Sequence, residues 1–264
     1  MQESRIGLLA GAGKLPVEFL KSARERGETV VTFALEGITN PEVEELSDEV
    51  VWIKPFKLGK FFKEVERRRP AKFFLLGKVE HKAAVDLKGL DLKAISFLMK
   101  LKDRKPQTII IGIIEELEKR GVKVANPESY LKRLLLTKGE VIGKPPSEEV
   151  LEDLKFGMEI AKEIASLDIG QTVVVKNKTV IAVEGIEGTD ECIKRGAALA
   201  GKGFVVCKAA RREQDMRVDV PTVGIKTVEL IETLGGKGLA VEAGKTYLLD
   251  RERVETGKIP VLAL

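Results

Sequence analysis

Short apolar runs alternate with helical patterns through the first third of the chain, and this alternation constrains the fold more than any other feature. The runs are bounded by glycine, proline or charge, as buried parallel strands are, and cover residues 6–10, 30–34, 50–53 and 73–76. Residues 16–26 and 58–69, which lie between runs, have the apolar spacing of helices. The order predicts an α/β fold that begins with a small Rossmann-like parallel sheet.

The remaining pattern predicts further helices and strands of a mixed kind. Helices are expected at residues 92–101, 107–120, 127–136, 150–167 and 227–234, with another beginning near Thr189. Strands are expected at residues 122–125, 203–207, 239–241 and 246–249, and a hairpin at residues 171–185 with Asn177 in its turn. The second half therefore reads as mixed α/β.

The domain boundary is expected at residues 137–149, TKGEVIGKPPSEE. At roughly 150 residues per domain, a chain of 264 residues predicts about two domains. This segment holds two glycines and the Pro145-Pro146 pair between helical patterns, which is typical of a linker. We therefore expect an N-terminal domain over residues 1–136 and a C-terminal catalytic domain over residues 150–264.

The composition excludes several classes of protein. With one histidine and two cysteines the chain cannot assemble the usual zinc sites, so hard-metal or metal-free chemistry remains. Its 45 basic and 41 acidic residues are interleaved, which does not indicate a nucleic-acid binder. No apolar stretch approaches the ~20 residues of a membrane span, and residues 1–16 do not resemble a leader. A soluble cytoplasmic protein is expected.

The GAGKLP loop, which follows the first predicted strand, partly resembles a dinucleotide-binding turn. Gly11 and Gly13 would let backbone N–H groups face an anion at a helix start, and Glu36 stands where a ribose-binding acid would lie. Pro16 replaces the third glycine of the motif. Nucleotide contact and a tight turn without a ligand both remain open.

The segment KAARREQDMRVDVPTVG, residues 208–224, is the richest in candidate site residues. In an extended chain Asp215, Arg217 and Asp219 would face the same way, so two carboxylates would flank a guanidinium. Carboxylates with substrate phosphate suit Mg²⁺, and arginine matches phosphate oxygens. A solvated loop with surface ion pairs is the alternative.

Three further acids follow predicted strands. Glu184 and Asp190 lie in AVEGIEGTDE, where Thr189 and Asp190 could instead cap a helix. Glu242 lies between a strand and a glycine in GLAVEAG, at a sheet edge where sites are commonly built. His81 follows the fourth strand and could face a cleft or simply pack against the fold.

With these motifs in view, the sequence resembles the LpxI-type UDP-2,3-diacylglucosamine pyrophosphatases, which are unrelated to metallophosphoesterases. The resemblance rests on GLLAGAGKLP, LGKV, LDIGQTVVV, AVEGIEGTD, QDMRVDVPTVG and GLAVEAG, in this order along nearly the whole chain. It implies a Rossmann-like domain, a linker and a distinct C-terminal domain, with substrate held between the domains. It also implies Mg²⁺-dependent hydrolysis of the UDP-linked, diacylated glucosamine to UMP and the diacylated sugar phosphate, in lipid A biosynthesis.

The resemblance also implies roles for particular residues. Asp219 would be the essential acid and Asp215 a metal ligand or supporting carboxylate, with Asp190 as a further Mg²⁺ (or Mn²⁺) ligand. Substrate and phosphate contacts would come from Gly11, Gly13, Glu184, Thr189, Lys208, Gln214, Arg217, Thr222 and Glu242. The chain departs from the family at Lys102-Asp103-Arg104 and at Arg212-Glu213, so no role is carried over to Asp103.

The sequence bears on two other functions. A dehydrogenase would need a Tyr-Lys or Cys-His pair, which the sequence does not offer, whereas a non-catalytic nucleotide-sugar binding or regulatory protein stays open. The expected partner is the UDP-linked diacylated glucosamine, and no nucleic acid. Acyl chains also predict weak, salt-sensitive attachment to the inner membrane surface. A homodimer is compatible with the sequence, which does not determine the oligomeric state.

Overall fold

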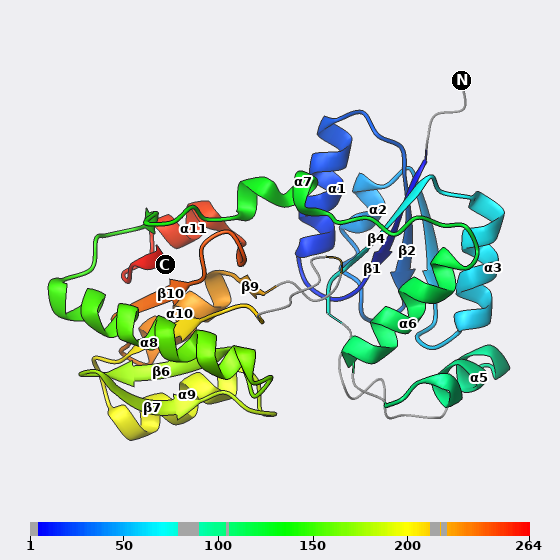
Figure 1. Ribbon diagram of the computed structural model, residues 1–264. Coiled ribbons are helices and arrows are strands. Elements are labelled where there is room, and N and C mark those ends of the chain that lie inside the picture. Colours follow the sequence, from blue (N-terminus) through cyan, green and yellow to red (C-terminus); the bar gives the residue numbers. More distant parts are fainter. Residues whose placement is uncertain (1–4, 79–89, 104–105, 212–216, 218–220) are drawn as a thin grey trace. The chain divides into compact units, whose positions relative to one another are not determined.

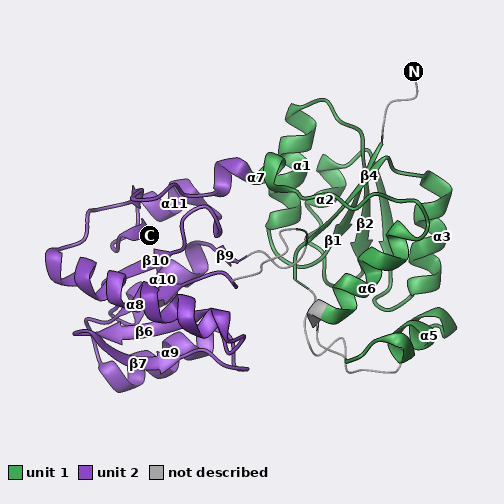
Figure 2. Ribbon diagram, in the orientation of Figure 1, with its two compact units in different colours: residues 1–131, 215–219 green, residues 132–214, 220–264 purple. Residues whose placement is uncertain are grey.

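The computed structural model describes residues 5–78, 90–103, 106–211, 217 and 221–264. It divides the chain into two compact units (Figure 2). The first comprises residues 1–131 and 215–219, and the second comprises residues 132–214 and 220–264. Each unit has its own sheet and helices, which confirms the α/β class with a parallel first sheet and a mixed second one.

The first unit is built on a four-stranded parallel sheet in the order β3-β2-β1-β4 (Figure 1). Its strands are β1 (Ile6–Ala10), β2 (Val30–Leu35), β3 (Glu49–Ile53) and β4 (Lys72–Leu76). Ile6 is level with Val30 on one side and with Lys72 on the other. The order matches that of the first four strands of a doubly wound sheet.

Helices connect these strands, and further helices follow β4 along the chain. They are α1 (Leu15–Glu25), α2 (Val43–Leu46), α3 (Leu58–Arg68), α5 (Leu92–Lys100), α6 (Pro106–Glu118) and α7 (Glu128–Leu131). Pro16 lies in the first turn of α1, where its missing N–H costs nothing. The rings of Phe33, Phe61 and Phe73 lie within 6.0 Å of one another between the sheet and α3, so aromatic packing holds this face together.

Two predicted elements of this region take a different form. Residues 122–125 do not form a strand: Val124 makes one isolated parallel bridge to Phe73, which exchanges two backbone hydrogen bonds with Lys123 and Ala125. The helix expected over residues 127–136 ends at Leu131, because the chain tightens into a 3₁₀ turn, η1 (Lys132–Leu134), and then straightens where Leu135 bridges Tyr247.

The second unit is built on a six-stranded mixed sheet in the order β5-β12-β10-β8-β6-β7. The strands are β5 (Val141–Ile142), β6 (Thr172–Lys176), β7 (Thr179–Val183), β8 (Val205–Lys208), β10 (Gly238–Val241) and β12 (Val261–Ala263). β10 runs parallel to both β8 and β12, whereas β6 runs antiparallel to β8 and β7. β9 (Thr222–Val223) and β11 (Tyr247–Leu248) form a separate parallel pair.

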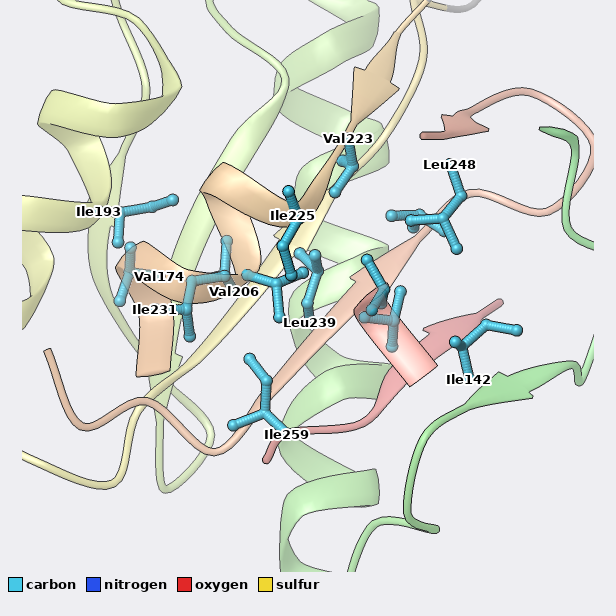
Figure 3. Packing of buried hydrophobic residues seen from close by; sticks show 14 of the residues in the cluster. Ile142, Val174, Ile193, Val206, Val223, Ile225, Ile231, Leu239, Leu248 and Ile259 are labelled. Carbon is cyan, nitrogen blue, oxygen red and sulfur yellow. The ribbon is translucent and has the colours of Figure 1, made fainter. Parts of the chain in front are cut away.

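Alternating strand residues of this sheet supply two cores. Val173, Val175 and Cys207 pack against α8 (Glu148–Ser166). Val174 and Val206 belong to the core on the opposite face, with residues of α9 (Thr189–Ala200), α10 (Ile225–Thr233) and α11 (Arg251–Glu255). Figure 3 shows the two valines near Ile193 and Ile231. Period-two alternation thus buries both faces of β6 and β8.

The predicted hairpin is confirmed, and a buried acid holds its turn. Asn177 and Lys178 both have left-handed backbone, with φ of 50° and 54°. Asp153, which is buried on α8, accepts their two backbone N–H groups at 2.8 and 2.7 Å. The turn is therefore fixed to the core of the second unit.

The segment expected as a linker contributes to the second sheet, because β5 lies within it and pairs with β12. Its role as a linker stays a prediction.

Cys192 and Cys207 are both buried. Burial raises the pKa of the Cys192 thiol to about 11 and that of the Cys207 thiol further, so both thiols are protonated at neutral pH. Within the described ranges, no helix combines the length and the apolar character that crossing a membrane requires.

Candidate functional site

Three predicted site residues gather at one edge of the second sheet. Lys208 ends β8, and its antiparallel neighbour Thr172 begins β6, so both lie at the same edge. Glu242 follows β10, and its N–H donates to the carbonyl of Lys208 at 3.1 Å. Glu184, which follows β7, donates its N–H to the carbonyl of Thr172 at 2.8 Å. The strand directions alone therefore bring these side chains together.

A chain of hydrogen bonds links two of these side chains through Thr189, and we call Lys208, Thr189 and Glu184 the Lys208 cluster. The Lys208 ammonium donates to Thr189 Oγ1 at 3.0 Å. Thr189 Oγ1 donates to Glu184 Oε1 at 3.2 Å, and the other carboxylate oxygen accepts the N–H of Gln171 at 3.3 Å. Lys208 is only 8% exposed, so its charge is held largely out of water.

Thr189 is not the cap of its helix. Gly188, with φ of 84°, is the N-cap of α9 and makes no side-chain capping bond, while Thr189 is already inside the helix. The Thr189 hydroxyl is therefore directed to Lys208 and Glu184, and the capping interpretation of this residue is wrong. Asp190 lies exposed in the first turn of the same helix, where a negative charge is favourable.

Glu242 is buried and fixes the backbone that follows Lys208. Its Oε2 accepts the N–H of Ala210 at 2.9 Å, and its Oε1 pairs with Lys245 at 2.8 Å. The bond to Ala210 thus holds the start of the charged segment in place. Contact between Glu242 and substrate stays a prediction.

Sequence reasoning missed Gln171, which lies beside the Lys208 cluster. Its Nε2 is buried and has no hydrogen-bond partner among the residues described, which costs about 1–3 kcal/mol in a closed fold. A ligand oxygen would satisfy it. The preceding Gly170 is the feature that could have pointed here, because a Cβ at that position would lie 2.0 Å from the carbonyl oxygen of Glu184.

The charged segment is only partly described. Asp215, Asp219 and Gln214 lie outside the described residues, as does His81. Arg211 donates to Asp168 at 2.8 Å, and Arg217, in a turn grouped with the first unit, donates to Glu118 at 3.2 Å. Thr222 begins β9 and lies level with Tyr247.

The carboxylates of the Lys208 region do not make a metal site by themselves. Across the described ranges, no group of three His, Cys, Asp or Glu side chains is placed to hold an ion. Glu184 and Glu242 each have both oxygens engaged by neighbours. The metal-ligand roles expected for Asp190, Asp215 and Asp219 stay predictions.

The Gly11 loop of the first unit has a structural explanation. The N–H groups of Gly11 and Ala12 donate to the carbonyls of Leu76 and Lys78 at 2.7 and 2.8 Å, so they do not face an anion. A Cβ on Gly11 would lie 2.7 Å from the Lys78 carbonyl oxygen. Gly13 has φ of 95°, which favours glycine. Nucleotide contact at this loop stays a prediction.

Fold and site together define a two-unit α/β protein with a Lys-Thr-Glu cluster, built around a buried lysine, at the edge of its mixed sheet. Comparison with known protein families identifies the family within this class. Residues 5–134 match the LpxI N-terminal domain and residues 137–257 match the LpxI C-terminal domain. The chain belongs to the LpxI family, which confirms the resemblance seen in its motifs.

A curated relative agrees with this assignment. The UDP-2,3-diacylglucosamine pyrophosphatase LpxI of Caulobacter vibrioides is 29% identical over 260 residues, which cover 95% of this chain and 92% of the relative. Among solved structures, a biotin carboxylase complex from Campylobacter jejuni aligns with a TM-score of 0.30 at 14% identity, over 75% of this chain and 42% of that one. N5-carboxyaminoimidazole ribonucleotide synthetase from Thermotoga maritima aligns with a TM-score of 0.29 at 14% identity, over 70% and 42%. Overlaps this weak, over less than half of those chains, are not evidence of shared activity.

Proposed function

We propose that this protein hydrolyses the pyrophosphate of UDP-2,3-diacylglucosamine to UMP and 2,3-diacylglucosamine 1-phosphate in lipid A biosynthesis. The observation that carries the proposal is the match of both LpxI domains, which together extend over residues 5–134 and 137–257. The relative from Caulobacter vibrioides bears this activity in its name and aligns over 92% of its length. The substrate class follows from that name.

The Lys208 cluster suits the recognition of a phosphate group. A pyrophosphate carries negative charge on its non-bridging oxygens, and an ammonium held largely out of water attracts it more strongly than an exposed one would. Thr189 accepts a hydrogen bond from the Lys208 ammonium and donates one to Glu184, and Gln171 Nε2 adds a buried donor without a partner among the described residues. We assign these groups to binding and charge stabilisation.

The chemical step needs a water molecule and a base. Water attacks one phosphorus, the bond from that phosphorus to the bridging oxygen breaks, and the other phosphate leaves with the electron pair. The proton lost by water is accepted by a carboxylate, for which Asp219 is our candidate on the family resemblance. Asp215 and Asp219 would hold Mg²⁺ or Mn²⁺ together with substrate phosphate, and the ion would neutralise developing charge.

Incubation of the protein with UDP-2,3-diacylglucosamine and Mg²⁺ tests the proposal through the appearance of UMP. Excess EDTA should abolish turnover, and Mg²⁺ or Mn²⁺ should restore it. Lys208→Met removes the buried ammonium and should lower turnover at least about a hundredfold, whereas Lys155→Met on the exposed face of α8 should not. Full turnover in chelator would remove the metal from the mechanism but leave hydrolysis standing.

The second candidate is a protein that binds the UDP-sugar without cleaving it. The Lys208 cluster alone is compatible with it, because binding needs only the cation and its donors. Intact UDP-sugar after incubation with Mg²⁺, together with saturable binding by calorimetry, would favour this candidate over hydrolysis.

The expected surroundings are part of the proposal. We place the protein in the cytoplasm with weak attachment to the inner membrane surface, because the proposed substrate carries two acyl chains. Attachment that depends on basic side chains should loosen as salt rises. A homodimer stays a proposal as well, to be tested by sedimentation.

A further inference from the structure

Helix α5 carries two apolar faces, of which only one is buried. Ala94 and Phe97 point into the first unit, where Phe97 lies against Gly112 of α6 so closely that a Cβ there would be 2.9 Å from the ring. On the other side Leu92 is 86% exposed, Met99 80% and Ile95 42%. The core of the unit therefore accounts for only half of the apolar residues of this helix.

The exposed residues form one stripe. At about 100° per residue, positions 92, 95 and 99 fall within an arc of roughly 60°, as i, i+3 and i+7 positions do. Lys93 and Lys100, both exposed, lie on the adjacent arc, and exposed Lys102 follows the helix. We call Leu92, Ile95, Met99 and these three lysines the α5 face.

The helix is held in place with this face outward. Asp91 caps it, with Oδ1 accepting the N–H of Ala94 at 2.7 Å. The other oxygen of Asp91 accepts the N–H of Gly59 at 2.8 Å, which ties the start of α5 to the start of α3. Figure 1 shows α5 as an outlying helix of the first unit, below α3. Both carboxylate oxygens of Asp91 thus accept backbone hydrogen bonds at the start of the helix, and the α5 face itself consists of apolar and basic side chains.

We propose that the α5 face docks on an anionic lipid membrane. Apolar side chains beside lysines match the boundary between acyl chains and negatively charged headgroups. A second copy of the chain is a poorer match, because a stable protein interface needs about 800 Å² from each partner and three side chains cannot supply it. A face of this size suits weak, reversible membrane binding. The proposal deepens the membrane attachment suggested above, and its evidence lies in α5 and not in the Lys208 cluster.

Vesicle sedimentation with the full chain tests this inference. The wild type should bind vesicles that contain about 30% phosphatidylglycerol, and it should bind less at high salt. Leu92→Ser with Met99→Ser should lower the partition coefficient at least about tenfold. Leu199→Ser, at a residue 68% exposed on α9, is the matched control and should change nothing.

Two further arms identify the partner and separate this inference from the proposed reaction. Lys93→Ala with Lys100→Ala should weaken binding to anionic vesicles and remove most of its salt dependence. Hydrolysis of detergent-dispersed UDP-2,3-diacylglucosamine does not need a membrane and should be unchanged in the Leu92/Met99 variant. If the wild type does not hydrolyse this substrate, the proposed reaction is refuted, but the α5 inference is not. Vesicle binding equal in wild type and variant, absence of wild-type binding, or a wild-type dimer that the variant abolishes would each overturn the α5 assignment.

Discussion

The hydroxyl of Thr189 is the centre of the Lys208 cluster, and its removal should release both charged groups that it joins. Thr189→Val keeps the shape of the side chain and deletes the oxygen, whereas Thr189→Ser keeps the oxygen and deletes a methyl group. The bond from Lys208 is 3.0 Å long and involves a charged donor, which is worth about 1.5 kcal/mol or more. The 3.2 Å bond to Glu184 is long for a hydroxyl donor and adds about 1 kcal/mol.

The expected loss for Thr189→Val is therefore about 2–3 kcal/mol in the free energy of unfolding of the second unit, or ~1 M in the urea midpoint. Because a chain of two units need not unfold in one step, peptide-resolved hydrogen exchange in urea should follow α9 and β8. Fluorescence of Trp52, the sole tryptophan, reports the first unit and should not change.

Turnover of UDP-2,3-diacylglucosamine should fall about tenfold or more in Thr189→Val, because Lys208 is no longer oriented, and Thr189→Ser should stay near wild type. Equal exchange rates and equal turnover for the valine and serine variants would refute the idea that the hydroxyl holds the ammonium. Loss of stability without loss of turnover would make the cluster structural only.

Other residues give further expectations. Asp219→Asn should fold and bind UDP-sugar but lose at least about a hundredfold in steady-state turnover, with Asp215→Asn costing less; near-normal turnover of Asp219→Asn would remove it as the base. Asp153→Ala leaves two turn amides without their acceptor, so urea unfolding should show a loss of about 2–3 kcal/mol and Asp153→Asn a smaller one. The backbone amide of Thr137 and then an arginine lower the pKa of Glu140 from its ordinary value of 4.5, so its stabilisation is complete above pH 4.5 and is lost as pH falls through the lowered pKa. Glu140→Gln should therefore lower stability at neutral pH and flatten its decline in acid, and parallel pH curves for the two proteins would contradict this.

The inner strands of the first sheet, β1 and β2, could be predicted because both of their faces are buried. The β2 segment, Val30–Leu35, is almost wholly apolar and is followed by a turn that contains a charged residue. The strand can therefore be recognised from its own sequence. β5, β9 and β12 are two or three residues long, and each is defined by pairing with residues far away in the chain. Local pattern holds no information about such pairing.

The candidate site divides in the same way. Glu184, Lys208 and Glu242 could be predicted because side chains that follow strands collect at a sheet edge. The direction of the Thr189 hydroxyl could not be predicted, because it depends on the strand register that places Thr172 opposite Lys208. Gln171 was missed because its importance comes from Gly170, whose close approach to Glu184 is a tertiary contact.

The position of β12 between β5 and β10 has a consequence for the order in which the protein can fold during synthesis. The four strands of the first unit are complete once residue 76 has been made, so that sheet can pair early. Val141 of β5, in contrast, must wait for Leu262, about 120 residues later, which at about 5–20 residues per second takes roughly 6–24 s. Until β12 is made, β5 has no partner in the sheet, and the edge of β10 that faces away from β8 is open to other chains. On the ribosome the second unit is thus the part of this protein that most needs protection from aggregation.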